Sequence, residues 1–140
     1  MFMKSIQSLC LIQSILMKTD LSNATFIIPI RIESDDRLRN VVTSIAFLVE
    51  NFDTNIIVKE VDKESVFQTE VLPIFEEILE VDLWKNFHHI FERSEEPLFH
   101  RQRVLNEMIA ECETDIVVNY DCDVILPMKS YELAYNGITE

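Results

Sequence analysis

Short apolar runs alternate with amphipathic stretches along most of this 140-residue chain, and this alternation restricts the fold more than any other feature. Isoleucine, valine and phenylalanine dominate the runs, as in strands buried on both faces; the runs cover residues 25–30, 55–61, 88–92 and 115–120. Apolar residues spaced three and four apart predict helices at residues 38–49, 67–79 and 104–112, with a last helical segment at 128–135. This order predicts an α/β fold, a mostly parallel sheet with flanking helices, in which ligands bind beyond the carboxyl ends of the strands.

The boundaries of two helices follow from local signals. Residues 1–22 are expected to form an N-terminal amphipathic helix and residues 23–140 a single domain, because apolar residues recur on one helical face before residue 17. Ser94 or a neighbour is expected to cap the third helix of the domain, with Glu95 and Pro97 in its first turn. No apolar run reaches the roughly 18 residues that a spanning helix requires, so no membrane span is predicted.

The chain is strongly acidic, with 12 lysines and arginines against 25 aspartates and glutamates and a net charge of −13. Nucleic acids and anionic membranes attract positive surfaces, so the sequence predicts that neither is a partner. A single glycine excludes the glycine-rich loops of P-loop and dinucleotide-binding proteins. Three cysteines without a CxxC pair argue against a disulfide framework and favour a reducing, cytoplasmic setting.

The six arginines all lie in two short windows, residues 31–39 and 93–103, whereas the lysines are scattered. Arg31 comes directly after the first predicted strand. A planar guanidinium can hold phosphate oxygens in pairs, so local clusters of arginine on an acidic chain predict a site for a compact anion. The alternative is that these arginines pair with the abundant carboxylates on solvated helix faces.

Two aspartates, Asp121 and Asp123, follow the fourth apolar run. A bend at a strand end can bring both carboxylates toward one site, and hard oxygen donors of this kind hold Mg²⁺ or Mn²⁺ beside a diphosphate. Such a metal stabilises the negative charge of a leaving group. The alternative is a pair of solvated loop residues, because a D-x-D tripeptide also arises by chance in an acidic chain.

Three segments, taken in order, resemble glycosyltransferases of the GT-A fold. Phe26–Arg31 resembles the first strand and turn of that fold, and Asn119–Pro127 resembles its D-x-D strand end. Phe99–Asn106 resembles the F-N-R-x-x-x-L-N segment of galactosyltransferases and chondroitin polymerases, with His100 in place of the asparagine. The resemblance implies the Rossmann-like half of a GT-A fold, which binds a nucleotide-diphospho-sugar, here a UDP-sugar.

The resemblance also implies roles for individual residues. Asp123 and Asp121 would hold Mn²⁺ or Mg²⁺, and Asp121 would also contact the ribose or the sugar. Asp62, or Glu60, would lie near the base. The residues expected around the nucleotide and its diphosphate are Pro29, Arg31, Arg37, Arg101 and Arg103.

The activity implied by the resemblance is transfer of the sugar to a hydroxyl of a saccharide acceptor. In the family, the acceptor-binding half and the catalytic base follow the D-x-D segment, whereas this chain ends 17 residues after Asp123. We therefore expect the acceptor half to be absent and these 140 residues to be inactive alone.

Two alternative functions remain open at the level of sequence. One is a non-catalytic binding or assembly module that pairs through an open sheet edge with a partner chain or with a second copy as a homodimer. The other is a phosphatase of the haloacid-dehalogenase type, in which Asp121 would be the nucleophile.

Overall fold

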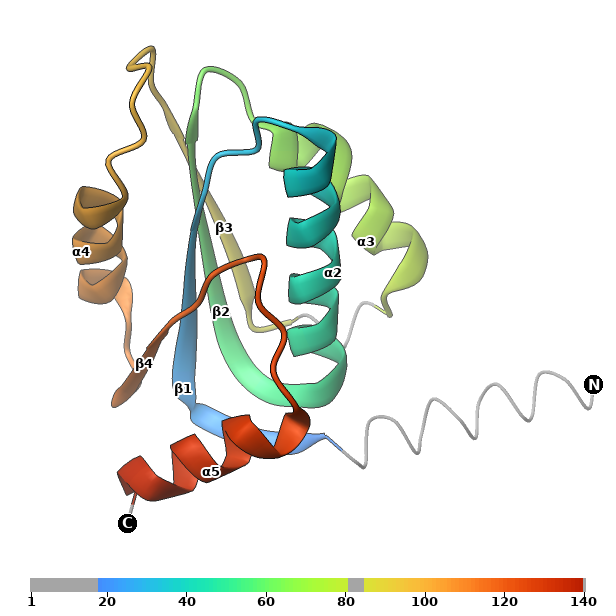
Figure 1. Cartoon of the computed structure of the whole chain (residues 1–140), viewed down its shortest axis with the longest axis vertical. Coiled ribbons are helices and arrows are strands. Elements are labelled where there is room, and N and C mark those ends of the chain that lie inside the picture. Colours follow the sequence, from blue (N-terminus) through green and yellow to red (C-terminus); the bar gives the residue numbers. More distant parts are fainter. Residues whose placement is uncertain (1–17, 81–84, 140) are drawn as a thin grey trace, which may run out of the picture.

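The computed structural model describes residues 18–80 and 85–139, which form one sheet with helices packed against it (Figure 1). The strands are β1 (Thr19–Ile30), β2 (Phe52–Asp62), β3 (Phe87–Arg93) and β4 (Ile116–Asn119). The helices are α2 (Asp35–Asn51), the π-helical turn η1 (Phe67–Val71), α3 (Leu72–Ile78), α4 (Arg101–Glu111) and α5 (Met128–Thr139).

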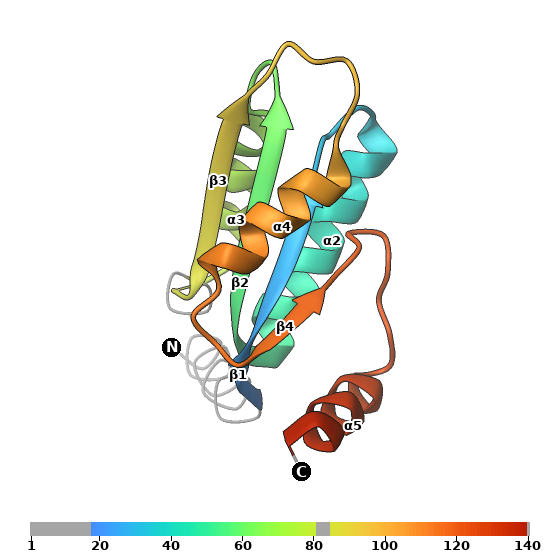
Figure 2. The same cartoon turned by 90° about the vertical axis from the view of Figure 1, so that its left-hand side faces the viewer.

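The four strands form a parallel sheet in the order β3-β2-β1-β4 (Figure 2). Ile27 in β1 lies opposite Ile57 in β2 and opposite Asn119 in β4. Strand β3 pairs with the other side of β2, also in parallel. The predicted α/β fold with a parallel sheet and flanking helices is therefore confirmed, and the arrangement is Rossmann-like.

Helices cover both faces of the sheet, which explains why the second part of β1, Phe26–Ile30, is apolar at every position. Alternate residues of β1, such as Phe26 and Ile28, pack against α2, η1 and α3 on one face. Ile27 packs on the opposite face against Val104 and Met108 of α4. Figure 1 shows α4 on one side of the sheet and α2 and α3 on the other, with α5 near the start of β1.

Helix α2 begins where the sequence provides a cap. Ser34 Oγ accepts a hydrogen bond of 3.2 Å from the N–H of Arg37, and Asp35 and Asp36 occupy the first turn. Both features stabilise the positive end of the helix. The first turn of α2, which contains Arg37, is thereby fixed at the carboxyl edge of the sheet.

The expected start of the third helix near Ser94 is wrong. The N–H of Ser94 donates to the carbonyl of Asp62 over 2.9 Å, and this bond continues the pairing of β2 with β3. The chain then runs as a loop over residues 95–100, and α4 begins only at Arg101. This loop brings Phe99 to the carboxyl end of β1.

The N-terminal boundary also differs from the prediction. Residues 19–22 were expected to end an N-terminal helix, but they form the start of β1. Thr19 and Asp20 already pair with β2. Residues 1–17, which make up the rest of that predicted helix, lie outside the described residues. In the described ranges 18–80 and 85–139, none of the helices has the length and apolar character needed to cross a bilayer.

Candidate functional site

The candidate site lies at the carboxyl ends of β1 and β4. Within the sheet, β2 and β3 lie on one side of β1. The chain then crosses over and places β4 on the other side of β1 (Figure 2). Parallel sheets leave a crevice at such a reversal of strand order, because the connections on either side of it turn away from each other. The fold thus favours a ligand site between the ends of these two strands.

Pro29 helps to open this crevice. The backbone of Ile27 faces β4, since its carbonyl accepts a hydrogen bond of 3.1 Å from the N–H of Tyr120. Pro29, two residues later, faces the same side but has no N–H to donate. Because β4 has already ended at Asn119, the two strands separate there without leaving a donor of Pro29 unpaired.

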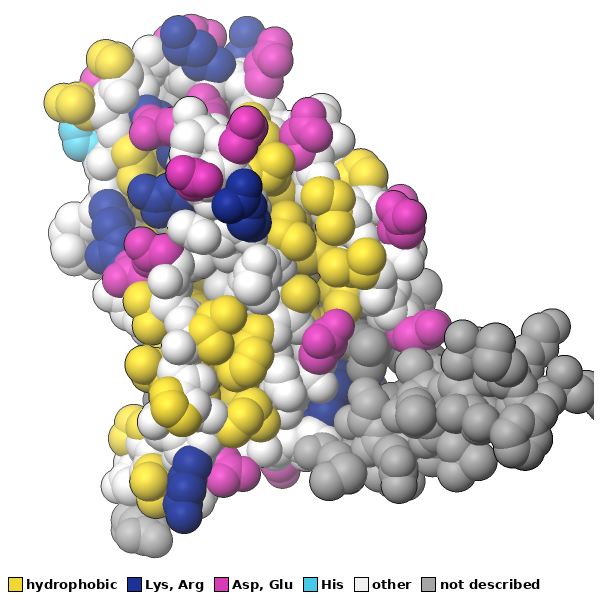
Figure 3. Space-filling model, turned by 45° about the vertical axis from the view of Figure 1, so that its right-hand side comes forward, with side chains coloured by type: hydrophobic (Ala, Val, Ile, Leu, Met, Phe, Trp, Pro, Cys, Tyr) yellow, Lys and Arg dark blue, Asp and Glu magenta, His cyan; other side chains and the backbone are white. Residues whose placement is uncertain are grey.

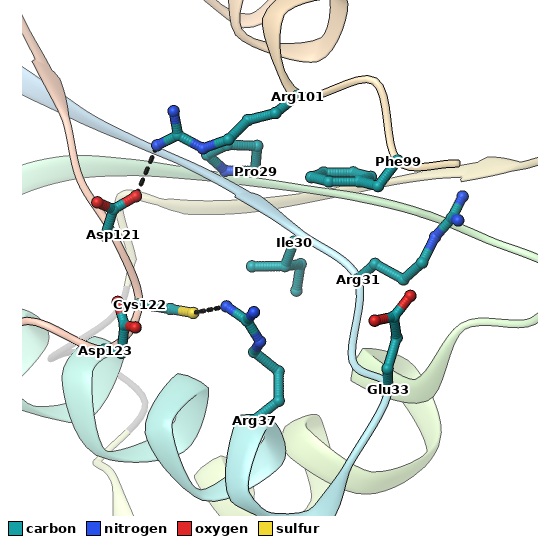
Figure 4. A pocket seen from close by; sticks show the side chains of 10 residues that line it. All are labelled: Pro29, Ile30, Arg31, Glu33, Arg37, Phe99, Arg101, Asp121, Cys122 and Asp123. Atoms are coloured by element: carbon teal, nitrogen blue, oxygen red, sulfur yellow. Dashed lines mark hydrogen bonds and ion pairs between the residues drawn. The ribbon is translucent and has the colours of Figure 1, made fainter. Parts of the chain in front are cut away.

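A cavity of about 290 Å³ occupies the space between the separated strands (Figure 4). This volume is at the lower end of the range for small-molecule sites, roughly 300–1,000 Å³. Segments distant in sequence form its walls: Pro29, Ile30, Arg31 and Glu33 at the end of β1, Arg37 from α2, Phe99 and Arg101 at the start of α4, and Asp121, Cys122 and Asp123 after β4.

Opposite charges balance in the cavity, although the whole chain has a net charge of −13. Its walls hold three guanidinium groups and three carboxylates. Arg101 Nη2 donates to Asp121 Oδ1 over 2.6 Å and to Asn119 Oδ1 over 3.2 Å. A locally neutral cavity with fixed charges of both signs suits an anion that binds together with a cation.

Arg31 lines the cavity but uses most of its donors on the backbone. Its Nε donates to the carbonyl of Val61 over 2.7 Å, and its Nη1 donates to the carbonyls of Glu96 and Pro97 over 3.2 and 3.1 Å. Its guanidinium carbon lies 5.5 Å from the centre of the Phe99 ring. Arg31 therefore ties the ends of β1 and β2 to the 95–100 loop, and its charge remains next to the cavity.

Arg37 is the guanidinium with the fewest commitments in the cavity. Its Nη1 donates to Cys122 Sγ over 3.5 Å, and among the described residues it forms no ion pair. Contact with the Cys122 sulfur, together with the charges of Asp123 and Glu33, raises the pKa of Arg37 above its usual value. Arg37 is thus a fixed positive charge whose remaining donors are available to a ligand.

The two aspartates lie on one turn after β4. The N–H of Val124 donates to the carbonyl of Asp121 over 3.2 Å, which makes Cys122 and Asp123 the central residues of a four-residue turn. Asp121 points toward Arg101, whereas the carboxylate of Asp123 has no ion-pair partner among the described residues (Figure 4). Asp123 is therefore the more available of the two carboxylates.

The carboxylates of the cavity fit a divalent metal that needs few protein ligands. Nowhere in the described ranges do three or more His, Cys, Asp or Glu side chains come together as a metal cage. Mg²⁺ and Mn²⁺ do not require such a cage, because they are often held by one or two carboxylates and complete their coordination with substrate phosphates and water. The exposed oxygens of Asp123, next to Asp121, match this second mode.

Asp62 and Arg103, both predicted for the site, lie outside the cavity. Asp62 is the last residue of β2, and its Oδ1 accepts from the N–H of Lys63 over 2.7 Å. Arg103 donates to Glu92 of β3 over 2.9 Å and to Glu107 of α4 over 2.7 Å. These contacts are structural, so neither side chain is oriented toward a ligand in the cavity.

Glu60, the alternative to Asp62, is fully buried within the sheet. Its two carboxylate oxygens accept from the Ser65 hydroxyl over 2.5 Å and from the Phe67 N–H over 3.0 Å, and Nε2 of His89 lies 3.4 Å away. The carboxylate thereby holds the turn that leads from β2 into η1. Glu60 therefore has a structural role and does not line the cavity.

The predicted residues that the structure does bring together are Pro29, Arg31, Arg37, Arg101, Asp121 and Asp123. Four further lining residues were not among the predicted binding residues: Ile30, Glu33, Phe99 and Cys122. Phe99 had a signal in the sequence, since it begins the segment that leads into Arg101. The scan against protein-family models finds no match for this chain, and the search of curated proteins finds none either.

Proposed function

We propose that this chain binds a nucleoside diphosphate sugar, with UDP as the nucleotide, together with Mn²⁺ or Mg²⁺ in the cavity between β1 and β4. The observation that carries the proposal is the convergence in one cavity of Arg37, Arg101 and the Asp121–Asp123 turn. These groups come from three separate parts of the chain. Their meeting at the reversal of strand order is what a nucleotide site in a parallel sheet requires.

The charges of the cavity support a diphosphate that binds with a metal. A diphosphate alone would be repelled by Asp121 and Asp123, and a metal alone would be repelled by Arg37 and Arg101. A metal–diphosphate complex satisfies both sets, because the arginines can hold phosphate oxygens while the carboxylates hold the cation. When bound, the metal would neutralise charge on the departing diphosphate.

Individual residues would then have different roles in binding. Asp123 would hold the metal, and Arg37 and Arg101 would donate to phosphate oxygens. Pro29 and the Phe99 ring form the apolar part of the wall, against which a base or a sugar ring can pack. Arg31 would contribute its charge and keep the loop before α4 in place.

Transfer of the sugar to a saccharide hydroxyl is the reaction that the sequence resemblance implies for such a site. We therefore propose that the chain supplies the donor-binding part of a glycosyltransferase. Binding of the donor nucleotide is the step that depends on the described residues, and it can be tested directly.

Isothermal titration calorimetry of UDP, with and without Mn²⁺, tests this proposal. We expect UDP to bind in the presence of Mn²⁺, and UMP to bind much more weakly because it lacks the second phosphate. Asp123→Asn keeps the size of the side chain and should weaken the Mn²⁺-dependent binding by about tenfold or more, equivalent to ~1.4 kcal/mol. Asp53→Asn, an exposed aspartate at the start of β2, is the matched control and should bind as the unmodified chain does.

Other outcomes would contradict the proposal. If UDP does not bind with or without Mn²⁺ and the chain forms dimers in sedimentation experiments, the assembly alternative is supported instead. If the chain releases phosphate from a simple phosphate ester and Asp121→Asn abolishes this release, the phosphatase alternative is supported.

A further inference from the structure

Two buried hydroxyl groups lie directly behind the turn that carries the aspartates. The hydroxyl oxygens of Tyr120 and Tyr131 are 2.8 Å apart. The Tyr120 hydroxyl also contacts the carbonyl of Val124, and the N–H of Leu126 donates to the Tyr131 hydroxyl over 3.0 Å. Tyr120 directly follows β4 and Tyr131 belongs to α5, so the contacts join the end of the sheet, the segment at Val124–Leu126 and α5.

The partners fix the direction of every hydrogen bond in this group. A carbonyl only accepts, so the Tyr120 hydroxyl donates its single proton to Val124. The Tyr131 hydroxyl must then donate to Tyr120, and its oxygen accepts from the N–H of Leu126. The result is a continuous chain of bonds from Leu126 through both phenols to Val124, in which each hydroxyl donates once and accepts once.

This chain of bonds fixes both ends of the aspartate turn. The N–H of Tyr120 donates to the carbonyl of Ile27, which anchors the residue before the turn to β1. The hydroxyl of the same Tyr120 holds Val124, the last residue of the turn. Tyr131 extends the support to Leu126, two residues further along.

Both phenols are suited to this role because they are buried. Tyr120 and Tyr131 are 5% and 7% exposed. The Tyr131 ring also packs against Phe52, with ring centres 4.9 Å apart, which ties the hydroxyl to the core.

We propose that Tyr120 and Tyr131 are positioning residues, which hold the Asp121–Asp123 turn in the form that faces the cavity. If the proposed function holds, α5 sets the metal-binding geometry through Tyr131; this consequence rests on the proposed function. Figure 4 shows the turn with Asp121 directed at Arg101 and Cys122 at Arg37, an arrangement that depends on the path of the backbone. A turn free at Val124 would not keep these directions.

Tyr131→Phe tests the inference, because it removes the hydroxyl and retains the ring. Tyr135→Phe is the matched control: Tyr135 lies on the same helix, and its hydroxyl accepts a hydrogen bond from the N–H of Asn23, away from the turn. In the ligand-free protein, we expect Tyr131→Phe to speed amide hydrogen exchange of Val124 and Leu126 by about tenfold. Amides in the centre of β1 should keep their rates, and Tyr135→Phe should leave the turn unchanged.

The second measurement is the factor by which Mn²⁺ strengthens UDP binding. A loss of general stability would not change this factor, whereas displacement of Asp123 should reduce it, by about tenfold in Tyr131→Phe and in Tyr120→Phe. Unchanged exchange at Val124 and Leu126 in both tyrosine variants would overturn the inference, as would an unchanged Mn²⁺ factor. If the unmodified chain does not bind UDP, the proposed function fails, and the exchange rates alone decide whether the tyrosines position the turn.

Discussion

Arg101 Nη2 and Asp121 Oδ1 form an ion pair of 2.6 Å that joins the first residue of α4 to the turn after β4. The two side chains are 44% and 59% exposed, so water screens the pair and it contributes at most about 1 kcal/mol to stability. A ligand phosphate can therefore replace Asp121 as the partner of Arg101 at small cost. The pair keeps the guanidinium in place for the ligand without holding it strongly.

The first prediction compares Arg101 with Arg103, its neighbour on α4. Arg101→Gln should weaken UDP binding in the presence of Mn²⁺ by about tenfold or more, because a charge-assisted hydrogen bond contributes roughly 1.5–3 kcal/mol. Arg103→Gln should leave the affinity unchanged, because Arg103 is engaged by Glu92 and Glu107 outside the cavity. Calorimetric titration of both variants checks this, and equal losses in the two would contradict the assignment of Arg101 to the site.

The second prediction concerns Arg37, which has a similar neighbour on α2. Arg37→Gln should weaken UDP binding by about tenfold with little effect on the urea midpoint, because among the described residues the Arg37 guanidinium donates only to the Cys122 sulfur. Arg39→Gln is the control, since Arg39 faces Asp36 at 3.6 Å in an exposed pair. If Arg37→Gln binds UDP as well as Arg39→Gln does, the phosphate does not contact α2.

These pairs also show what the sequence could and could not predict about the site. The sequence shows that the arginines cluster in two windows, and each window contributes at least one arginine to the cavity. Residues two apart on a helix point about 200° from each other around its axis, so only one of Arg37 and Arg39, and one of Arg101 and Arg103, can face the same cavity. Which one faces it depends on how each helix packs, and packing is not local information.

The strands were predictable for a physical reason. A parallel strand buried on both faces is apolar at nearly every position. Residues 25–30 have this composition, and the centre of residues 55–61, Ile56–Val58, has it too. The start of α4 was not predictable from Ser94, because the N–H of that residue bonds to the Asp62 carbonyl across the sheet. A capping residue is a local signal, and here a contact between distant segments overrides it.

The third prediction concerns Arg31 as the support of the 95–100 loop. Arg31→Met keeps the apolar stem but removes three hydrogen bonds to backbone carbonyls, so the free energy of unfolding should fall by about 2 kcal/mol. Amide exchange in the loop should become faster at the same time. Arg31→Lys should not restore stability, since one ammonium cannot reach carbonyls on both β2 and the loop.

Arg93→Met is the control for this experiment. Arg93 is an exposed arginine, and its ion pair with Glu95 has a long separation of 3.8 Å. Urea unfolding of both variants measures the difference. An Arg31→Met variant as stable as Arg93→Met would show that the three hydrogen bonds do not hold the loop.

The fourth prediction concerns the buried carboxylate of Glu60. Burial alone raises the pKa of Glu60, but hydrogen bonds from His89, Ser65 and the Phe67 N–H outweigh it, so that the pKa is lowered overall from 4.5. The folded state therefore prefers the ionised form. The stability that this preference supplies is complete above the unfolded pKa of about 4.5 and is lost as the pH falls through the lower folded value.

Glu60→Gln removes the ionisation and should flatten this part of the stability curve. At pH 7 the variant should be less stable by about 2 kcal/mol, because Gln offers one acceptor where the carboxylate has two. The gap should narrow as the pH falls below about 4.5. Glu92 and Glu107 also have lowered pKa values, but they titrate in both proteins, so the difference between the two curves isolates Glu60. Chemical denaturation from pH 7 to pH 3 measures both curves, with the exposed Glu64→Gln as control. Parallel curves for Glu60→Gln and the unmodified chain would contradict the prediction, because they would show that folding does not change the pKa of Glu60.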